Sequence, residues 1–186
     1  IAAHIYISLQ EIIAREISAT KPAVVTIGKF VGGEAPNIIP GEVVMEGTIR
    51  ALDKEVGEFI FDRMKDIVES TAKIFRGEAK LIELSSVPPL TNDTELAKEV
   101  TSYVKDLVGE KAVCLFEGGG MGSEDFASYS YEVPSVYLML GAGTKQENPL
   151  YGEPMHNEKV VFNEDILVTG AAMHTYCSIM WLKNNK

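Results

Sequence analysis

Cysteine is nearly absent from this 186-residue sequence, which contains only Cys114 and Cys177, far apart along the chain. Two isolated cysteines fit neither the close ligand spacing of a zinc motif nor that of a redox pair. So few cysteines are typical of a protein in a reducing compartment, where disulfides do not persist. We therefore expect a cytoplasmic protein.

Positive charge is also scarce, because 17 lysines and arginines stand against 27 aspartates and glutamates, which gives a net charge of -10. Binding to nucleic acid or to an anionic membrane needs clustered cations, and no run of lysine or arginine occurs here. No apolar run approaches the roughly 20 residues of a membrane span, and the amino terminus lacks the pattern of a signal peptide. We expect a small molecule or another protein as the partner, and neither nucleic acid nor membrane.

The motifs of two common enzyme classes are incomplete. A glycine-rich loop over 118–126 follows an apolar stretch as a dinucleotide-binding loop would, but its third glycine position is Ser123 and no clear long helix follows. The loop also lacks the Gly-x-Ser-x-Gly sequence of a serine hydrolase, although Ser123, Asp125 and His156 supply the residue types of a catalytic triad. A serine hydrolase remains a weaker alternative, and a plain flexible turn is the strongest competing interpretation of the loop.

What the sequence does contain is the composition of a globular protein, with 46% hydrophobic and 24% charged residues. One stretch stands out, a loop over 32–41 that Pro36 and Pro40 restrict to few shapes. From residue 43 to 51 the side chains alternate between apolar and polar, which predicts a half-buried strand with an open polar face that carries Arg50. Taken alone, Asn37 in the loop is a turn residue and Arg50 a solvated charge.

The first half of the chain predicts two helices and three strands. An apolar stripe begins at Ile1 and marks a helix that Lys21 and Pro22 end, and Asp53 is a good N-cap for a second helix that stops at Gly77. The order helix, strand, strand, helix, strand matches a ferredoxin-like β-α-β-β-α-β plan whose first strand is missing. The strands are predicted from β-branched and apolar residues over 23–31, 43–51 and 79–84.

The second half predicts a different kind of domain. Adjacent prolines mark a crossing, after which Asn92 and Glu95 resemble a capping box that opens a helix closed at Gly109. A last helix starts near Asn163. Between these helices the sequence predicts two short strands, apolar enough to be buried on both faces by helices, over 113–116 and 135–140.

Of the three histidines, only His156 lies outside a helical pattern. It is in a loop over 151–157 that also contains Gly152 and Pro154, shortly after the second apolar strand and near the sheet edge where open α/β folds bind ligands. An imidazole there can bind a metal or transfer protons, although a lone loop histidine is more often merely exposed. His4 and His174 belong to helical patterns, and we expect them to be structural.

Six short stretches carry more information together than each does alone. They are Leu-Gln-Glu-Ile at 9–12, Gly-Gly-Glu-Ala-Pro-Asn-Ile-Ile-Pro at 32–40, Gly-Thr-Ile-Arg at 47–50, Pro-Pro at 88–89 with Asn-Asp at 92–93, Met-Gly-Ser-Glu-Asp-Phe at 121–126, and Met-His-Asn at 155–157. In this order, along nearly the whole chain, they resemble the aminoacylase and carboxypeptidase family of co-catalytic metallopeptidases. The resemblance is strongest to its branch of hippurate hydrolases and N-acyl-amino-acid amidohydrolases.

This resemblance implies a catalytic α/β domain that holds two divalent metal ions and is interrupted by a ferredoxin-like lid domain through which homodimers form. Residues 1–87 are similar to the α+β lid without its first strand, and residues 88–186 to the closing part of the helix-covered α/β catalytic domain. The implied function is hydrolysis of the amide bond of N-acyl amino acids or small peptides by a metal-activated water. The implied metals are zinc, manganese, cobalt or nickel.

The resemblance also implies roles for individual residues. His156 matches a metal-ligating histidine, and Asn37 and Arg50 match lid residues that bind the carboxylate or carbonyl oxygen of the substrate. An extended strand rises about 3.3 Å per residue, so one small substrate does not reach both Asn37 and Arg50. We therefore expect these two residues to serve different active sites of a homodimer. A wall of the substrate cleft is implied for Gly120, Ser123 and Glu124.

The remaining parts of the family's catalytic site have no match in this sequence. The resemblance implies further metal ligands, a Glu-Glu pair whose first member is the general base, and a lid histidine that assists the oxyanion, all on sequence before Ile1. We therefore expect no catalytic residue in this chain and no hydrolysis by the chain alone. The alternative is a non-enzymatic, ferredoxin-like module that binds a small ligand between subunits, with His156 an ordinary loop residue.

Overall fold

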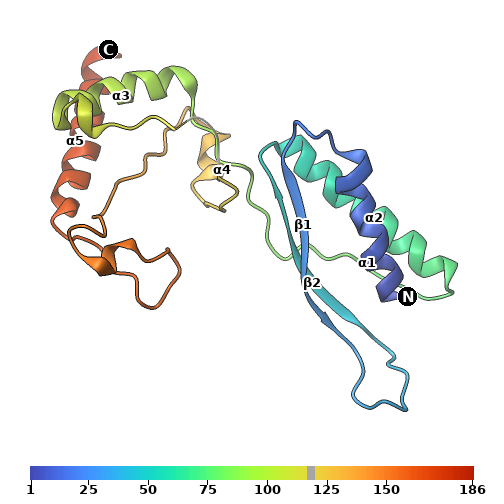
Figure 1. The fold of residues 1–186 in the computed structure, drawn as a ribbon. Coiled ribbons are helices and arrows are strands. Elements are labelled where there is room, and N and C mark those ends of the chain that lie inside the picture. The colour runs from blue at the N-terminus through green and yellow to red at the C-terminus, as the bar shows by residue number, and fades with distance from the viewer. Residues whose placement is uncertain (117–119) are drawn as a thin grey trace. The chain divides into compact units, whose positions relative to one another are not determined.

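The computed structural model describes residues 1–116 and 120–186, so Glu117 and the first two residues of the glycine-rich loop, Gly118 and Gly119, lie outside the described residues. The chain divides into two compact units (Figure 1). Unit 1 comprises Ile1–Leu90 with Gly118–Ala127, and unit 2 comprises Thr91–Glu117 with Ser128–Lys186.

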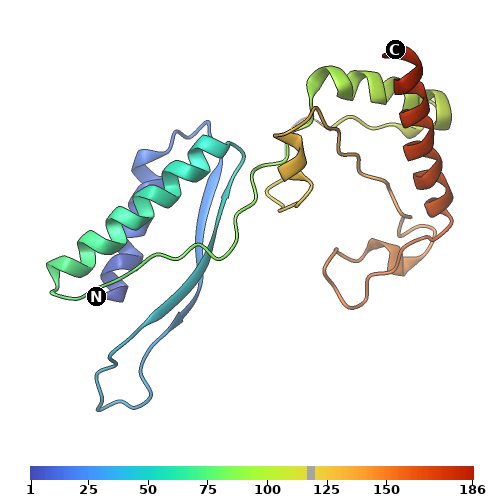
Figure 2. The ribbon, with the colours of Figure 1, turned by 180° about the vertical axis from the view of Figure 1, so that it is seen from behind.

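Unit 1 is a two-stranded antiparallel sheet with two helices on one of its faces. The helices lie on the same side of the hairpin in both views (Figures 1 and 2). The mixture of helices and strands agrees with the predicted fold class. In chain order the elements are α1 (Ala2–Glu11), the π-helical turn η1 (Ile12–Glu16), β1 (Ala23–Val31), β2 (Val44–Ala51) and α2 (Lys54–Ile74).

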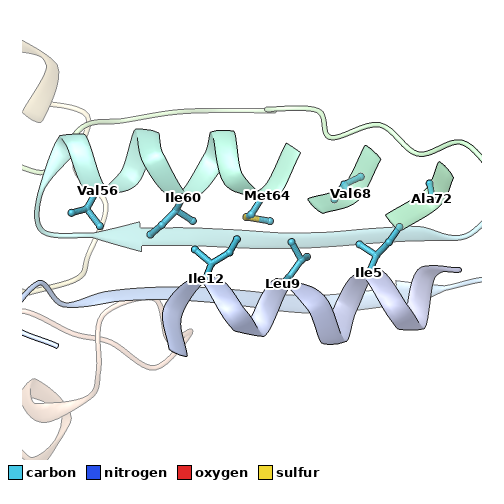
Figure 3. Close-up of a cluster of buried hydrophobic side chains, with 8 residues drawn as sticks. All are labelled: Ile5, Leu9, Ile12, Val56, Ile60, Met64, Val68 and Ala72. Atoms are coloured by element: carbon cyan, nitrogen blue, oxygen red, sulfur yellow. The ribbon is translucent and has the colours of Figure 1, made fainter. Parts of the chain in front are cut away.

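The core of unit 1 lies between α1 with η1 and α2 (Figure 3). Ile12 and Ile60 have no exposed surface. Burying a side chain of this size stabilises the fold by about 1.5–3 kcal/mol relative to leaving it in water. The members of this core recur at helical spacing along the two helices; they are Ile5, Leu9, Ile12, Val56, Ile60, Met64, Val68 and Ala72.

The alternation in β2 decides which side chains face the helices. Gly47 belongs to the apolar set, and it approaches the carbonyl oxygen of Thr26 so closely that any side chain would overlap that oxygen. The predicted half-buried strand is confirmed. Its two faces carry Met45, Ile49 and Ala51 toward the helices, and Glu46, Thr48 and Arg50 toward the exposed side.

Helix α2 begins and ends where its capping residues predict. The Asp53 carboxylate accepts hydrogen bonds from two backbone N–H groups of the first turn, at 2.9 and 3.3 Å. Lys21 also donates to this carboxylate at 2.8 Å, and this hydrogen bond lowers the pKa of Asp53. At the other end the left-handed Arg76, with φ of 57°, lets Gly77 N–H return to a carbonyl of the last turn.

The first helix ends earlier than the sequence predicts. It is regular only as far as Glu11, continues as the π-helical turn, and gives way to extended backbone at Ile17 rather than at Lys21. Glu16, at the end of the turn, accepts two hydrogen bonds from the Arg63 guanidinium of α2, at 2.6 and 2.9 Å. This bidentate contact between the two helices is a tertiary interaction that local periodicity does not reveal.

The predicted strand over 79–84 is wrong, because this segment pairs with no strand among residues 1–116 and 120–186. Its Ala79 and Leu81 still pack against the core of unit 1. In a split β-α-β arrangement, the two strands that a helix joins are separated by another strand. The predicted plan lacks that strand, so the segment has no neighbour with which to share a ladder of hydrogen bonds.

Unit 2 is built around two helices that pack against each other, α3 and α5. In chain order, the elements that follow α2 are α3 (Thr94–Val108), η2 (Glu110–Ala112), α4 (Ala127–Ser130), η3 (Pro149–Gly152) and α5 (Ile166–Asn184). Within the described part of the chain, no helix combines the length and the apolar character needed to cross a membrane.

Polar side chains tie the end of α5 to α3. The buried Tyr103 donates its hydroxyl to the Glu99 carboxylate and accepts a hydrogen bond from the Asn184 amide at 2.8 Å. Asn185 donates to the same carboxylate at 2.9 Å. Burial, followed by the hydrogen bond to Glu99, raises the pKa of Tyr103.

The predicted strands over 113–116 and 135–140 are also wrong, since the described residues of unit 2 form no sheet. Strands of this apolar kind need neighbours on both edges, and those neighbours are not adjacent in the sequence. Instead, the Asn92 side chain takes the place of a neighbouring strand. Its amide donates to the carbonyl of Tyr137 at 3.1 Å, and its oxygen accepts from Tyr137 N–H at 2.8 Å.

The starts of the two long helices in unit 2 differ slightly from the prediction. Asp93, and not Asn92, is the N-cap of α3, because its carboxylate accepts a hydrogen bond from Leu96 N–H at 2.8 Å. Helix α5 starts at Ile166 rather than near Asn163, whose side chain accepts a hydrogen bond from Asp165 N–H at 3.0 Å in the preceding turn.

Candidate functional site

Arg50 contacts the glycine-rich loop over 118–126 at Met121. It lies near the end of β2, on the exposed face of the sheet, and its Nη1 donates a hydrogen bond to the carbonyl oxygen of Met121 at 2.8 Å. Both residues belong to unit 1. On the same face Lys29 and Glu46 form an exposed ion pair at 2.5 Å. Arg50 is therefore a bridge within unit 1 and not only a solvated charge.

The segment from Gly120 to Ala127 contains the predicted cleft wall. Gly120 and Ser123 are exposed, and Glu124 is half-buried. The Glu124 side chain accepts a hydrogen bond from Phe126 N–H at 3.2 Å, and its carbonyl accepts one from Ala127 N–H at 3.1 Å. These bonds form a turn that leads into the short helix α4, so three predicted cleft residues lie on one segment beside Arg50.

Asn37 lies elsewhere on unit 1, in the loop between β1 and β2 that precedes Val44, whereas Arg50 lies near the other end of β2. It is exposed in a turn closed by a hydrogen bond from Ile38 N–H to the Ala35 carbonyl at 3.2 Å. Gly33 enters this loop with φ of 88°, a conformation that suits glycine. From Val44 to Arg50 an antiparallel strand rises about 20 Å, so the structure does not bring Asn37 and Arg50 together.

His156 lies in unit 2, on an exposed turn, with a backbone φ of 64°. Left-handed backbone is uncommon for residues other than glycine, although histidine is among the residues that adopt it most readily. Such conformations persist where the surroundings impose them, and they concentrate at functional sites. The backbone at His156 is therefore a second observation, beside the motif, that marks this residue.

The loop around His156 is closed and internally hydrogen-bonded. Asn163 N–H donates to the Ala142 carbonyl at 2.9 Å, which joins the two ends of the loop. Within it, the Asn148 side chain accepts from Leu150 N–H at 3.0 Å, and the Asn157 side chain accepts from Lys159 N–H at 2.9 Å. The loop thus presents His156 from a defined backbone even though the histidine side chain faces solvent.

The residues present fit one ligand of a metal site and not a complete site. Over residues 1–116 and 120–186, no three His, Cys, Asp or Glu side chains gather closely enough to hold a metal ion. An exposed imidazole on a held loop suits a single ligand, whereas catalytic zinc sites use three protein ligands. The other two histidines are exposed and lie in helices: His4 in α1 has its ring centroid 4.6 Å from that of Phe75, and His174 lies within α5.

The structure supports neither of the two weaker motif interpretations, the serine hydrolase and the dinucleotide-binding loop. The nucleophile of an α/β hydrolase lies on a sharp turn between a strand and a helix, but Ser123 follows no strand of the described chain. A dinucleotide-binding loop opens a long helix, whereas the next helix here, α4, has four residues. Cys114 and Cys177 are free thiols, and burial raises the pKa of Cys177.

A surface depression of about 520 Å³ in unit 2 lies between residues 91–94 and 130–134. None of the predicted site residues lines it. Sequence reasoning also missed the acceptor of Arg50, and no signal could have revealed it, because a backbone carbonyl is common to every residue type.

Comparison with known proteins relates most of the chain to one family. The profile described as Peptidase family M20/M25/M40 matches residues 10–178. An uncharacterized hydrolase of Sinorhizobium fredii is 36% identical over 90% of this chain and 40% of its own length. The hippurate hydrolase of Campylobacter jejuni is 29% identical over 98% of this chain and 46% of its own length. The chain therefore spans less than half the length of these curated relatives.

A solved structure supports the fold. The Bacillus subtilis YXEP protein, described as a dinuclear metal binding peptidase from the M20 family, superposes with a TM-score of 0.75 at 23% identity. The superposition covers 98% of this chain and 45% of that protein. At this level of identity the likeness concerns the arrangement of the chain.

Proposed function

Because the chain belongs to peptidase family M20/M25/M40, we propose that it forms the lid and the closing part of the catalytic domain of a metal-dependent amidohydrolase. Residues 1–87 are the lid and residues 88–186 the catalytic part in this proposal. The substrate is an N-acyl amino acid or a small peptide, whose amide bond is cleaved by water. The observation that carries the proposal is the hydrogen bond from Arg50 to Met121, which joins the proposed carboxylate binder to the proposed cleft wall.

Arg50 is proposed to bind the free carboxylate of the substrate. A guanidinium has five N–H donors in a planar fork, and the contact with Met121 involves Nη1. The rest of the fork remains suited to two oxygens of one carboxylate. The exposed Ser123 and the backbone of Gly120, on the same segment, can add donors, and Glu124 shapes the turn that presents them.

His156 is proposed to hold one of two divalent ions, which are zinc, manganese, cobalt or nickel. Imidazole suits several of these metals, and two bound ions would acidify a water held between them. The other ligands and the general base are assigned to a part of the protein outside this chain, because the relatives are more than twice as long as the stretch they share with it. We expect the chain by itself to hydrolyse no N-acyl amino acid above background with added zinc, manganese or cobalt.

Asn37 is proposed to act in the active site of a second subunit, since it and Arg50 lie at opposite ends of β2. A homodimer formed through the lid supplies this geometry. Mixing full-length Asn37→Ala with full-length Arg50→Ala gives heterodimers with one site that carries both substitutions and one that carries neither. Such heterodimers should recover up to about half of the wild-type activity. Activity no higher than that of the two parent variants, in dimers shown to be mixed, would refute the arrangement.

The test of the proposed function compares substrates with and without a free carboxylate. In the full-length protein, Arg50→Met should raise KM for an N-acyl amino acid by at least tenfold and leave KM for the matching N-acyl amino acid amide within about twofold. Lys29→Met is the matched control, because it removes a cation from the same exposed sheet face without touching residue 121. Equal effects of Arg50→Met on both substrates would contradict the assigned role.

A further inference from the structure

The loop that carries His156 contains a close contact between Gly143 and Tyr151. Gly143 has φ of 109°, and a Cβ atom at this position would lie 2.9 Å from Cγ of Tyr151. Any side chain at residue 143 would be strained by the backbone and would also overlap the ring. The half-buried Tyr151 ring therefore rests directly against the backbone of Gly143.

A second contact of the same kind runs in the opposite direction. The aliphatic part of Lys145 lies across Gly152, where any side chain would overlap it. The contacts between the chain segment 143–145 and the turn 149–152 are thus reciprocal. In each contact, a long side chain of one segment packs against a glycine of the other. We call these four residues, Gly143, Lys145, Tyr151 and Gly152, the clasp.

The clasp ends four residues before His156, whose left-handed backbone needs surroundings that impose it. The hydrogen bonds of the loop join its ends and shape its turns, and the clasp packs the turn before His156 against the start of the loop. We propose that Tyr151 is a positioning residue for His156, acting through the clasp. The proposal rests on the proposed function in so far as His156 is a metal ligand.

The first experiment measures backbone amide exchange by NMR in the 186-residue chain. Tyr151→Ala should speed exchange at Val160 and Asn163, whose N–H groups bond within the loop, by at least tenfold, with α3 unchanged. Tyr151→Phe keeps the ring and should restore wild-type rates. Gly141→Ala is the matched control, because a Cβ there meets no atom within 4 Å. Wild-type exchange in Tyr151→Ala would overturn the clasp.

The second experiment measures metal content and steady-state kinetics in the full-length protein. Tyr151→Ala should lower metal content and kcat by at least tenfold and leave KM within about twofold, because Arg50 is untouched, and Tyr151→Phe should behave as wild type. Normal metal content and kcat in Tyr151→Ala would overturn the positioning role. Normal metal content in His156→Ala would instead refute His156 as a ligand, while the exchange result would still decide whether the clasp exists.

Discussion

Unit 1 buries eight apolar side chains between its helices, whereas in the described part of unit 2 the buried apolar side chains are Tyr103 and Val104. The difference follows from how each unit obtains its strand partners. β1 and β2 are neighbours in sequence and pair as a hairpin, which gives the helices a surface to cover. The apolar segments of unit 2 have no partner nearby in the chain, so Leu115 and Phe116 remain 73% and 82% exposed.

This contrast teaches that the candidate residues depend on different supports. Arg50 projects from a paired strand over a packed core, while His156 projects from a loop held by its own turns and close contacts. Changes in the core of unit 1 should therefore act on stability, and changes in the loop of unit 2 on function. The only tryptophan, Trp181, lies in α5, so its fluorescence reports unit 2 separately.

The largest effect is expected from His156→Ala in the full-length protein. Loss of one ligand from a shared metal site should reduce hydrolysis by orders of magnitude, because the remaining ligands no longer hold the metals in place. Circular dichroism should show an unchanged fold, since the side chain is exposed. His174→Gln within α5 is the control, and normal metal stoichiometry with near-normal turnover in His156→Ala would contradict the assignment.

The next effect concerns the core of unit 1. Ile60→Ala should reduce the free energy of unfolding of unit 1 by about 2–5 kcal/mol, because the fully buried side chain leaves a cavity. A urea titration monitored by amide exchange in β1 and β2 measures this change. The urea midpoint reported by Trp181 fluorescence should stay at its wild-type value. Ile74→Ala on the same helix removes a 76% exposed side chain and should have little effect. A parallel shift of both signals would mean that the two units unfold together.

A smaller effect is expected at the start of α3. Asp93→Ala should cost unit 2 about 1 kcal/mol, because the N-cap hydrogen bond to Leu96 is lost. The urea midpoint of Trp181 fluorescence should fall, and Asp93→Asn, which keeps a capping oxygen, should restore most of it. If Asp93→Ala leaves this midpoint unchanged, α3 does not limit the stability of unit 2.

The smallest effect is a difference in pH dependence. Hydrogen bonds from Arg63 and Lys21 lower the pKa values of Glu16 and Asp53, so their contribution to unit 1 is present above about pH 4 and is lost as pH falls through the folded pKa values. Burial raises the pKa of Tyr103, so its contribution to unit 2 is present below about pH 10 and is lost as pH rises through the folded value. Thermal unfolding of each unit, measured across a range of pH, should show both losses: an acid limb, in which unit 1 loses stability as pH falls, and an alkaline limb, in which unit 2 loses stability as pH rises.

Two substitutions check the assignment of these limbs. Glu16→Gln should flatten the acid limb of unit 1, and Tyr103→Phe should flatten the alkaline limb of unit 2. Each should leave the other unit's limb as in the wild type. An acid limb in unit 1 that Glu16→Gln does not change would mean that the pair with Arg63 contributes nothing measurable, as holds for many exposed ion pairs.

Part of the candidate site could be predicted from the sequence and part could not. The alternation around Arg50 predicted its exposed strand face, and the turn residues around His156 predicted a loop. The contact of Arg50 with Met121 was not predictable, because the two residues are 71 positions apart and the acceptor is a backbone atom. The contact of Tyr151 with Gly143 was not predictable for a similar reason, since a glycine in a loop does not indicate which side chain packs against its backbone.

By itself, the sequence determined the features that depend on near neighbours in the chain. Helical periodicity selected the core of unit 1, and Asp53 and the adjacent alternating strand set the order of its elements. Tertiary structure alone decided the features that depend on distant partners. It ended the first helix at a pair between Glu16 and Arg63, left 79–84 without a ladder, and placed an asparagine side chain where a strand was predicted beside 135–140. Strand hydrogen bonds and ion pairs each require a partner residue that folding brings close. A sequence pattern identifies the residue that needs a partner, but not the residue that will provide it.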